Sequence, residues 1–587
     1  MRNLFLLTVA FIFILGGTAY GNASSIAVIQ STDDIINPEV KIVSSGSNST
    51  SMRIEISSIA KTETEVAGNR FDKISISDEV DLIRSTTGEI GKPELPLHTT
   101  TLAIPDRGGI EIRINSSSYE VIENVDIAPV QAPIHEGEDE SGVLTIDNDV
   151  YSTDAFYPRE IVWANEPFVI RDFRGAGIVY CPVQYNPVTR QLRVYNNIDF
   201  DVVYTDEDAP NPAPARKQYI SEAFKPLYES LFDNYDEVCA DLPSKRGGYL
   251  IITHEMFYDS LLEFASWKHR KGYDVHLVPL TEIASNPSAY NIFEYIESAY
   301  NNWEIAPEFI LLVGDVTMPG GKRFPDYSYS YYTSDYPYGC VVGDDYFQDI
   351  MVSRIAIDTE LELSKIMTKT LTYEQYPEEM EDGWMDRGLS VGCNAGGWGP
   401  IPTTPRLTTL WVRQKLFDNG FSQCDTCFYW SGGPYCQPSV ITASLNRGTN
   451  IVSYRGLAGP SGWACPDYYY YDLNTLNNGY RGAVMISIVC GSGHYGSSTD
   501  PCFGEAWLRG GYGSDIRGGV VFYGTTDTDT HTRWNNPLMV GLYWGLFDED
   551  LTHFAQAVYR GKLLQYAVFP QHTQPYGTVE LYFHTYN

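Results

Sequence analysis

Residues 484–495 read VMISIVCGSGHY, an apolar run that ends in a cysteine and a series of small residues. Because only Ser487 interrupts the apolar run, the pattern predicts a strand that is buried on both faces of a parallel sheet. Cys490 follows that strand directly. The small residues Gly491 and Gly493 would let backbone N–H groups converge over the thiol, as an oxyanion site requires. The alternative is that Cys490 is a buried structural cysteine.

Similar apolar runs occur on both sides of this segment and alternate with stretches of helical spacing. Apolar strands separated by amphipathic helices are typical of parallel sheets that are covered on both faces. The sequence therefore predicts two tandem α/β subdomains, 247–380 and 387–575, the second of which carries Cys490. In such sheets, ligands bind beyond the carboxyl ends of the strands. The predicted strands are 249–253, 275–278, 309–313, 388–391, 450–454, 484–489 and 519–523, and the predicted helices are 259–271, 292–300 and 407–417.

The front of the chain has a different pattern. Between residues 38 and 205, short segments such as 110–114 (IEIRI) alternate apolar and polar side chains, with turn signals between them. This period of two predicts an all-β domain. Residues 206–220 follow as an acidic, proline-rich stretch, which predicts an exposed, extended linker. The dibasic pair Arg216 and Lys217 in this linker marks either part of a simple spacer or a processing site.

The first 21 residues have the features of a secretory signal peptide. Arg2 precedes an apolar run from Leu4 to Leu15, and small residues close the segment at Gly21. A membrane anchor would need a longer apolar run. We therefore expect a secreted or cell-surface protein with no membrane span in the mature chain. The net charge of −35 and the lack of a basic run argue against nucleic acid as a partner.

The cysteine pattern argues against a zinc site. Ten cysteines occur, and Cys424 and Cys427 form a CxxC motif, but no second Cys or His pair lies at zinc spacing. Disulfides are stable in the oxidising compartments that a signal peptide implies. We expect a disulfide that involves Cys424, Cys427 or Cys436, with the pairing left open.

A short acidic loop is a candidate calcium site. Residues 343–349 read GDDYFQD and supply Asp344, Asp345 and Asp349. Carboxylate oxygens are the ligands that calcium prefers. The alternative is that these side chains cap the turn before the next strand. No cofactor is expected to be required.

Several segments, in order along the chain, resemble the gingipain-like cysteine peptidase family. The sequence CGSGHY from Cys490, followed by PCFGEAW at 501–507, resembles the nucleophile segment of that family. Residues 453–456 (SYRG) with Trp463 resemble the loop that carries its catalytic histidine. The resemblance covers about 40–587 and implies a caspase-like α/β domain behind an all-β prodomain. The other matching segments are 91–96, 184–187, 307–315, 334–338, 343–354 and 531–534.

The resemblance implies that Cys490 is the nucleophile, that a histidine is the general base and acid, and that a carboxylate orients the histidine. The chain departs from this pattern, because Leu457 stands at the histidine position and residues 395–400 contain no acid. His531 and His494 are candidate replacement bases. Each of them is alternatively a surface or packing histidine.

The resemblance also places an aromatic side chain over the specificity pocket, at Trp534. Asp527 and Asp529 lie on the same segment. These two carboxylates would orient His531, favour a basic residue on the substrate, or simply cap a turn.

Two functions remain open from the sequence. In the first, the chain is the zymogen of an endopeptidase that cleaves proteins or peptides and is inhibited by its own prodomain until it is cut near Arg216. In the second, the chain is a pseudopeptidase that serves as a secreted binding module, because loss of the acid–base group slows catalysis by about 10²–10⁴-fold. The last segment, 576–587, is predicted to begin a truncated C-terminal region with a strand at 578–586.

Overall fold

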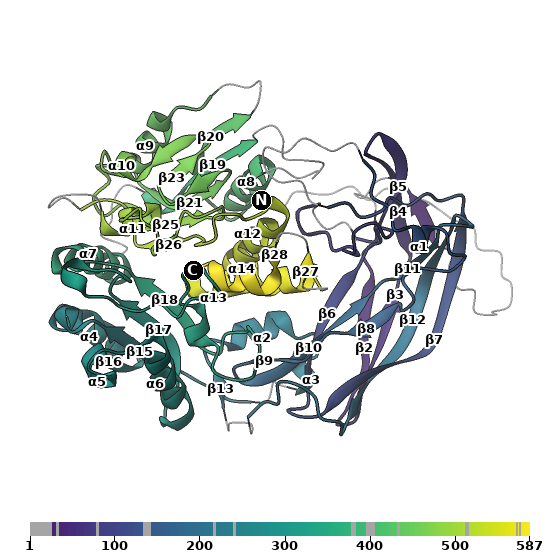
Figure 1. The fold of residues 1–587 in the computed structure, drawn as a ribbon, viewed down its shortest axis with the longest axis horizontal. Helices are drawn as coiled ribbons and strands as arrows, with labels where there is room; N and C mark the ends of the chain where they lie inside the picture. Colours follow the sequence, from purple (N-terminus) through teal and green to yellow (C-terminus); the bar gives the residue numbers. More distant parts are fainter. Residues whose placement is uncertain are drawn as a thin grey trace, which may run out of the picture.

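The computed structural model of the protein has two parts, a β-rich domain and an α/β domain, with a layer of helices between them (Figure 1). This arrangement confirms the predicted fold class. The described residues are 26–30, 35–77, 81–132, 143–214, 219–238, 242–376, 383–394, 405–430, 435–510, 516–570, 573–574 and 577–587. The predicted signal peptide, Arg216, Lys217 and residues 395–400 lie outside them. Within the described ranges, no helix combines the length and apolarity that a membrane crossing requires.

Alternating side chains build the β-rich domain. In β3 (Ser49–Glu55), Met52 and Ile54 are buried, whereas their neighbours along the strand are partly exposed, as the period of two predicts. β12 (Gln191–Thr205) runs antiparallel to β7 (Gly109–Glu123) along its whole length. The other elements of this part are β1 (Ala27–Ile29), β2 (Glu39–Ser45), β4 (Ser58–Val66), β5 (Asn69–Ser75), β6 (His98–Ile104), β8 (Val162–Ala164), β9 (Phe168–Ile170), β10 (Phe173–Tyr180), β11 (Val183–Asn186) and the short helix α1 (Asn148–Tyr151).

Two parallel sheets make up the α/β domain. Subdomain A has the strand order β16-β15-β17-β18, and subdomain B has the order β20-β19-β21-β25-β26. β17 (Pro307–Val313) is buried along its whole length. β25 (Gly482–Ser487) ends at Ser487, so Cys490 lies in the loop beyond the strand rather than at its last residue.

The remaining strands of these sheets are β15 (Gly248–Thr253), β16 (Asp274–Pro279), β18 (Met351–Ile355), β19 (Arg387–Asn394), β20 (Gln423–Trp430), β21 (Thr449–Arg455) and β26 (Val521–Tyr523). The helices are α4 (Leu262–Arg270), α5 (Leu280–Ile283), α6 (Ala289–Asn302), α7 (Glu360–Gln375), α8 (Pro405–Asp418), α9 (Pro438–Arg447), α10 (Tyr470–Leu473) and α11 (Phe503–Arg509). A small antiparallel sheet contains β22 (Ala458–Gly459), β23 (Gly462–Ala464) and β24 (Asp467–Tyr469). Short 3-10 helices lie at Asp81–Ile83, Glu255–Phe257, Asp259–Leu261, Pro319–Gly321, Tyr336–Gly339 and Trp384–Asp386.

The end of the chain is helical, so the predicted strand at 578–586 is wrong. In α14 (Val579–Thr585), the Thr578 hydroxyl accepts a hydrogen bond from the Leu581 N–H and caps the helix. Tyr582, Phe583 and Tyr586 are fully buried. With α12 (Thr532–Phe547) and α13 (Phe554–Val568), this helix forms the central layer in Figure 1. Two short strands, β27 (Thr573–Gln574) and β28 (Gly577–Thr578), precede it.

The two parts share one hydrophobic core. Leu82 and Ile83 of the β-rich domain belong to the same buried cluster as Leu538 of α12. Phe168 stacks on Phe347 of subdomain A, with ring centroids 3.8 Å apart. The segment after the linker adds the buried Phe224 to this core. It contains β13 (Ile220–Ser221), α2 (Lys225–Leu231), α3 (Tyr235–Val238) and β14 (Ser244–Lys245).

The linker is exposed only in part. Asn211 is buried, its side chain donates to the Pro167 carbonyl at 2.8 Å, and it accepts from the Asp344 N–H at 2.7 Å. Ala213 is also buried, and its N–H donates to the Asp106 carbonyl at 2.8 Å. The prediction of a wholly exposed linker is therefore wrong, because these contacts hold it against both parts of the molecule.

Arg171, in the turn between β9 and β10, anchors the β-rich domain to subdomain A. Its backbone N–H donates to Asp349 Oδ1 at 2.7 Å. Its guanidinium donates to the carbonyls of Asp349 (2.6 Å) and Pro307 (2.8 Å) and lies between the rings of Phe224 and Tyr300. The side chain is only 5% exposed. Its donors therefore satisfy buried carbonyl groups that have little access to water.

Replacing this anchor is expected to destabilise the protein. We expect Arg171→Met to lower the free energy of unfolding by about 3 kcal/mol, because two buried carbonyls lose their donors. Urea unfolding followed by tryptophan fluorescence measures the change. Arg190→Met is the matched control, since Arg190 forms only an exposed pair with Asp126, and such pairs contribute about 0–1 kcal/mol. Equal losses in the two variants would contradict the role of Arg171 as an anchor.

Candidate active site

Cys490 lies at the carboxyl edge of the subdomain B sheet and is half-buried. The Thr530 N–H donates to Cys490 Sγ at 3.3 Å, and the Thr530 hydroxyl oxygen lies 3.3 Å from the same sulfur. Thr530 belongs to the loop after β26, which is the neighbour of β25 in the sheet. The loops that follow adjacent parallel strands therefore meet at the thiol, as the strand pattern predicted.

The glycines after Cys490 fix the shape of the loop. Gly491 has a φ of +59°, and a Cβ there would lie 3.2 Å from the Thr528 side chain. The Gly491 N–H donates to the Asp527 carbonyl at 2.6 Å, and the Gly493 N–H donates to the Thr525 carbonyl at 3.0 Å. In this conformation, the two N–H groups predicted to form an oxyanion site are thus already bonded to backbone carbonyls.

The loop after β21 lies beside the cysteine loop. A Cβ on Gly491 would lie 3.3 Å from Pro460. Tyr454 stacks on Trp463, with ring centroids 4.3 Å apart and planes inclined by 7°. The Tyr454 hydroxyl accepts from the Leu457 N–H at 3.0 Å. These contacts hold the turn that contains Leu457, a side chain with no group that could carry a proton.

His531 caps helix α12. Its ring Nδ1 accepts from the Arg533 N–H at 3.2 Å, and its backbone N–H donates to the Tyr582 hydroxyl at 2.7 Å. The residue is 9% exposed and follows Thr530 directly. Its place in the fold is therefore next to the residue that contacts the sulfur.

His494 lies on the cysteine loop itself. Its backbone N–H donates to the Gly491 carbonyl at 3.1 Å. Burial lowers the pKa of its ring, although the charge of Asp326 opposes the shift. Its buried Nδ1 has no hydrogen-bond partner among the described residues. The ring is therefore held mostly neutral near pH 7.

Trp534, the aromatic residue that the resemblance places over a specificity pocket, is a core residue in this conformation. The side chain is fully buried and packs on Phe569, with ring centroids 4.0 Å apart, and on Tyr582 at 5.7 Å. Asp527 accepts from the Asp529 N–H at 2.9 Å. The pair therefore forms the turn that was the alternative to an orienting role, and burial raises the pKa of Asp527.

The β-rich domain reaches the same region. The residues Asp81–Ile83 pack against α12, whose first turn contains Arg533. Arg533 Nη2 donates to the Thr86 hydroxyl at 3.3 Å, and burial lowers the pKa of its guanidinium although Glu94 opposes the shift. The segment from Asp81 to Glu94 thus covers the start of α12, three residues beyond Thr530.

The predicted calcium ligands do not gather around a common point. Among the described residues, the only group of three acidic, Cys or His side chains close enough to share an ion does not include Asp344, Asp345 or Asp349. Both oxygens of Asp349 accept backbone N–H groups, from Arg171, Val341 and Val342. Asp345 also accepts two backbone N–H groups, and burial raises its pKa to about 7. The side chains of Asp345 and Asp349 thus bind backbone N–H groups of this loop and of Val169 and Arg171.

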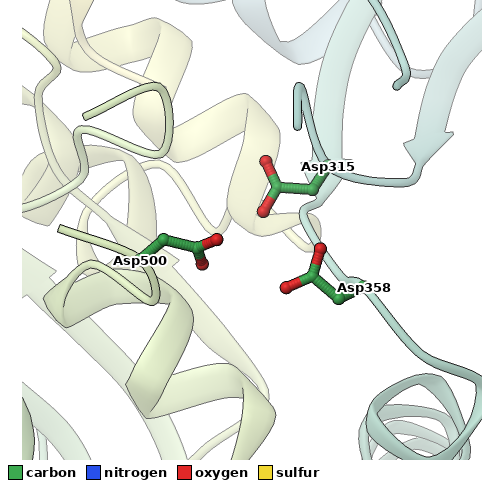
Figure 2. A group of neighbouring side chains, drawn as sticks. All are labelled: Asp315, Asp358 and Asp500. Carbon is green, nitrogen blue, oxygen red and sulfur yellow. The ribbon is translucent and has the colours of Figure 1, made fainter. Parts of the chain in front are cut away.

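Three other carboxylates do lie close together, those of Asp315, Asp358 and Asp500. Figure 2 shows their carboxylates turned toward one another across the junction of the two subdomains, and oxygens from all three lie within 4.8 Å of one another. Arg509 donates to Asp315 at 2.7 Å, to Asp500 at 3.0 Å and to Asp358 at 3.2 Å. Glu505 is a fourth carboxylate bonded to it, at 2.9 Å. The guanidinium therefore supplies the positive charge that this acidic cluster needs.

A second ion pair steadies the cysteine loop. Arg354 donates to both oxygens of Asp335, at 2.5 and 2.7 Å, and the Tyr495 hydroxyl donates to Asp335 at 2.8 Å. All three side chains are buried or nearly so. Since Tyr495 lies five residues after Cys490, this contact ties the loop to subdomain A.

The predicted disulfide is confirmed, and it joins Cys427 to Cys436 with Cα atoms 5.4 Å apart. Cys424 is buried and its sulfur lies 3.6 Å from the Ser390 hydroxyl. The CxxC motif is therefore not itself a disulfide.

Family models match nearly the whole chain. The model of Peptidase family C25 matches residues 242–584, and the model of its propeptide, Propeptide_C25, matches residues 30–239. The chain belongs to peptidase family C25. The predicted resemblance to gingipain-like peptidases with an N-terminal prodomain is confirmed.

Individual relatives agree with this membership. Gingipain R2 of Porphyromonas gingivalis is 24% identical over 537 residues, which cover 90% of this chain and 69% of the relative. Lys-gingipain of the same organism is 25% identical over 462 residues, which cover 76% of this chain and 26% of the relative. The crystal structure of the Arg-specific cysteine proteinase gingipain R (RGPB) matches with a TM-score of 0.52 and 20% identity, over 58% of this chain and 76% of that one. The complex of the pro- and mature domains of Porphyromonas gingivalis RgpB matches with a TM-score of 0.51 and 19% identity, over 58% and 77%.

Sequence reasoning missed four residues near the thiol, Arg455, Thr530, Tyr582 and Tyr586. Arg455 did carry a signal, because it is the one charged residue of β21 and lies at the end of that strand. Thr530 lies between Asp529 and His531, two residues that the sequence did mark, but it has no chemical signature of its own. The two tyrosines were assigned to a strand in a separate C-terminal segment, which hid their place in the core.

The acidic cluster gives a testable pH dependence. Burial and the charge of Asp500 raise the pKa of Asp358 to about 6 despite Arg509, whereas an unfolded Asp has a pKa of about 3.9. The folded protein therefore binds the extra proton between these values, so this group stabilises the fold at low pH and that stability is lost as the pH rises through 6. We expect the thermal midpoint of Asp358→Asn, relative to the parent, to rise as the pH increases from 4.5 to 7.5.

Glu263→Gln is the control for that measurement, because Glu263 is exposed on α4. Its midpoint relative to the parent should stay constant over the same pH range. A constant difference for Asp358→Asn as well would contradict the assignment of the proton to Asp358.

Proposed function

We propose that the chain is the zymogen of a secreted cysteine endopeptidase in which Cys490 is the nucleophile. The position of Cys490 is the observation that carries the proposal. Its thiol is half-buried and lies at the carboxyl edge of a parallel sheet. The loops after β21 and β26 lie beside the loop that contains Cys490. Membership of family C25 supports proteins or peptides as substrates. The apolar segment near the N-terminus supports secretion, to the medium or the cell surface.

In this proposal the β-rich domain acts as the inhibitor. It packs on the first turn of α12 through Asp81–Ile83 and through the contact of Thr86 with Arg533. A cut near Arg216 and Lys217 would separate the domains covalently. The shared core would still hold them together, because a cut in the linker removes none of its apolar contacts.

His531 is not free to act as the general base in this conformation. A neutral imidazole has one ring nitrogen that accepts and one that donates. Because Nδ1 of His531 accepts from the Arg533 N–H, the neutral ring carries its proton on Nε2. Such a ring can donate a proton to a leaving amine, but it cannot take one from a thiol unless the helix cap breaks.

This constraint favours a second candidate function, a pseudopeptidase that binds proteins or peptides without cleaving them efficiently. Leu457 holds the histidine position of the family pattern, and His531 is committed to the helix cap. A thiol without a general acid would cleave amides slowly, since the leaving amine must be protonated.

Active-site labelling distinguishes the two functions. The secreted chain is nicked with trypsin near Arg216 and treated with an arginyl or lysyl chloromethyl ketone, and peptide mapping follows each cysteine. A peptidase is expected to show saturable labelling of Cys490 and cleavage of casein that Cys490→Ala abolishes. Labelling of Cys490 that never saturates, together with no cleavage, would contradict the peptidase proposal and support the binding module.

Restoring the missing imidazole provides a second test. We expect Leu457→His to raise kcat/KM for peptide cleavage by about 10²-fold, because the side chain would stand at the family's acid–base position. Leu457→Gln is the matched control, since it adds polarity without a group that titrates near neutral pH. Equal activity of the two variants would contradict the assignment of this position.

A further inference from the structure

Arg455 is a buried cation without a carboxylate partner in the described part of the chain. It is the last residue of β21 and only 1% exposed. Its guanidinium donates to Asn536 Oδ1 at 2.9 Å and to the Thr532 carbonyl at 3.2 Å. None of the ion pairs among the described residues includes it. A buried charge is costly unless an opposite charge lies close by.

Cys490, Tyr582 and Tyr586 lie close enough to this guanidinium that their charges would raise its pKa. The Tyr582 hydroxyl accepts from the His531 N–H, and the Tyr586 hydroxyl donates to Asn535 Oδ1 at 2.6 Å. Burial raises the pKa of both tyrosines well above 10. Burial lowers the pKa of Arg455 to about 10, so it stays protonated at neutral pH. The thiol is therefore the one of the three that can supply a negative charge near pH 7.

We propose that Arg455 is the charge partner of a Cys490 thiolate and that this pair, rather than a histidine, activates the nucleophile. The inference rests on the proposed function only in taking Cys490 as the nucleophile. An adjacent arginine lowers the pKa of a thiol because it stabilises the thiolate.

Two groups beside the sulfur can donate to a thiolate. The Thr530 N–H donates to Sγ at 3.3 Å. The Thr530 hydroxyl oxygen accepts from Asn535 Nδ2 at 3.0 Å and lies 3.3 Å from the sulfur, so its proton can turn toward Sγ. The Thr530 carbonyl oxygen, 3.5 Å from Sγ, accepts from the neutral thiol and opposes its ionisation. Arg455 bonds to the carbonyl of Thr532, two residues further along. One short segment thus connects the sulfur and the guanidinium.

Other charged or titratable groups on the surrounding loops are Asp527, Asp529, His531 and His494. The two carboxylates oppose ionisation of the thiol, and the raised pKa of Asp527 reduces that effect. His531 is held by the helix cap, and burial keeps His494 mostly neutral. Arg455 is thus a buried cation whose guanidinium bonds to the segment that contacts the sulfur.

The proposal separates nucleophile activation from proton supply. With iodoacetamide, the thiolate attacks the methylene carbon, the S–C bond forms, the C–I bond breaks and iodide leaves, so no proton is transferred. Peptide cleavage additionally needs a proton for the leaving amine, which a guanidinium does not release near neutral pH. The pair therefore predicts fast alkylation whatever the rate of peptide cleavage.

The pH dependence of alkylation tests the pair. The full chain is treated with iodoacetamide between pH 5 and pH 10, and peptide mapping gives the rate at Cys490. We expect an apparent pKa at least one unit below the usual value of about 8.5. We expect Arg455→Met to return the pKa to about 8.5 or above, and Arg455→Lys to restore part of the shift. Arg190→Met, which removes an exposed arginine, is the control and should leave the pKa unchanged.

Two results would overturn the inference. One is a low pKa that persists in a folded Arg455→Met variant. The other is equal absorbance at 240 nm in the parent chain and in Cys490→Ala at pH 7. A thiolate absorbs at this wavelength, so a Cys490 thiolate would make the parent absorb more. This measurement does not require the Arg455→Met variant to fold. A low pKa without peptide cleavage would reject the peptidase proposal alone, whereas cleavage with a pKa near 8.5 would reject the charge pair alone.

Discussion

The arrangement of the active-site edge depends on one buried cation, Arg509. It bonds to Asp315, which follows β17, and to Asp358, which follows β18. It also bonds to Asp500, which precedes α11, and to Glu505 within that helix. The first two carboxylates belong to subdomain A and the others to subdomain B, so the guanidinium joins the two sheets. Since the loop from Cys490 runs directly into this segment, the position of the thiol relative to subdomain A is set by the same charges.

The β-rich domain packs against the α/β domain and is not a separate module that is joined only by a linker. Arg171 satisfies buried carbonyls of subdomain A, and Leu82 and Ile83 complete the core around α12. The helices α12, α13 and α14 lie between the two parts (Figure 1). The side of the site formed by α12 is therefore shaped jointly by the prodomain and the end of the chain.

The chemistry of the site departs from the family pattern in a consistent direction. In the proposed site, Leu457 stands where the family pattern has a histidine, and the strand before it ends in the buried Arg455. An imidazole can both accept and donate a proton near pH 7, whereas a guanidinium contributes charge alone. The proposed charge pair therefore gives the thiol electrostatic support without proton transfer from this loop.

The sequence by itself determined the fold class and the strands that lead to the candidate site, and it marked Cys490 as the candidate nucleophile, because these follow from local patterns of apolar residues and from one motif. Only the tertiary structure decided which groups surround the thiol. Thr530 is 40 residues from Cys490, and the carboxylates around Arg509 reach back to Asp315, 194 residues away. The helix α14 was misassigned for the same reason, since a short run of aromatic residues fits either a strand or a helix until its neighbours are known. Contacts between distant segments depend on how whole elements pack, and a local pattern does not contain that information.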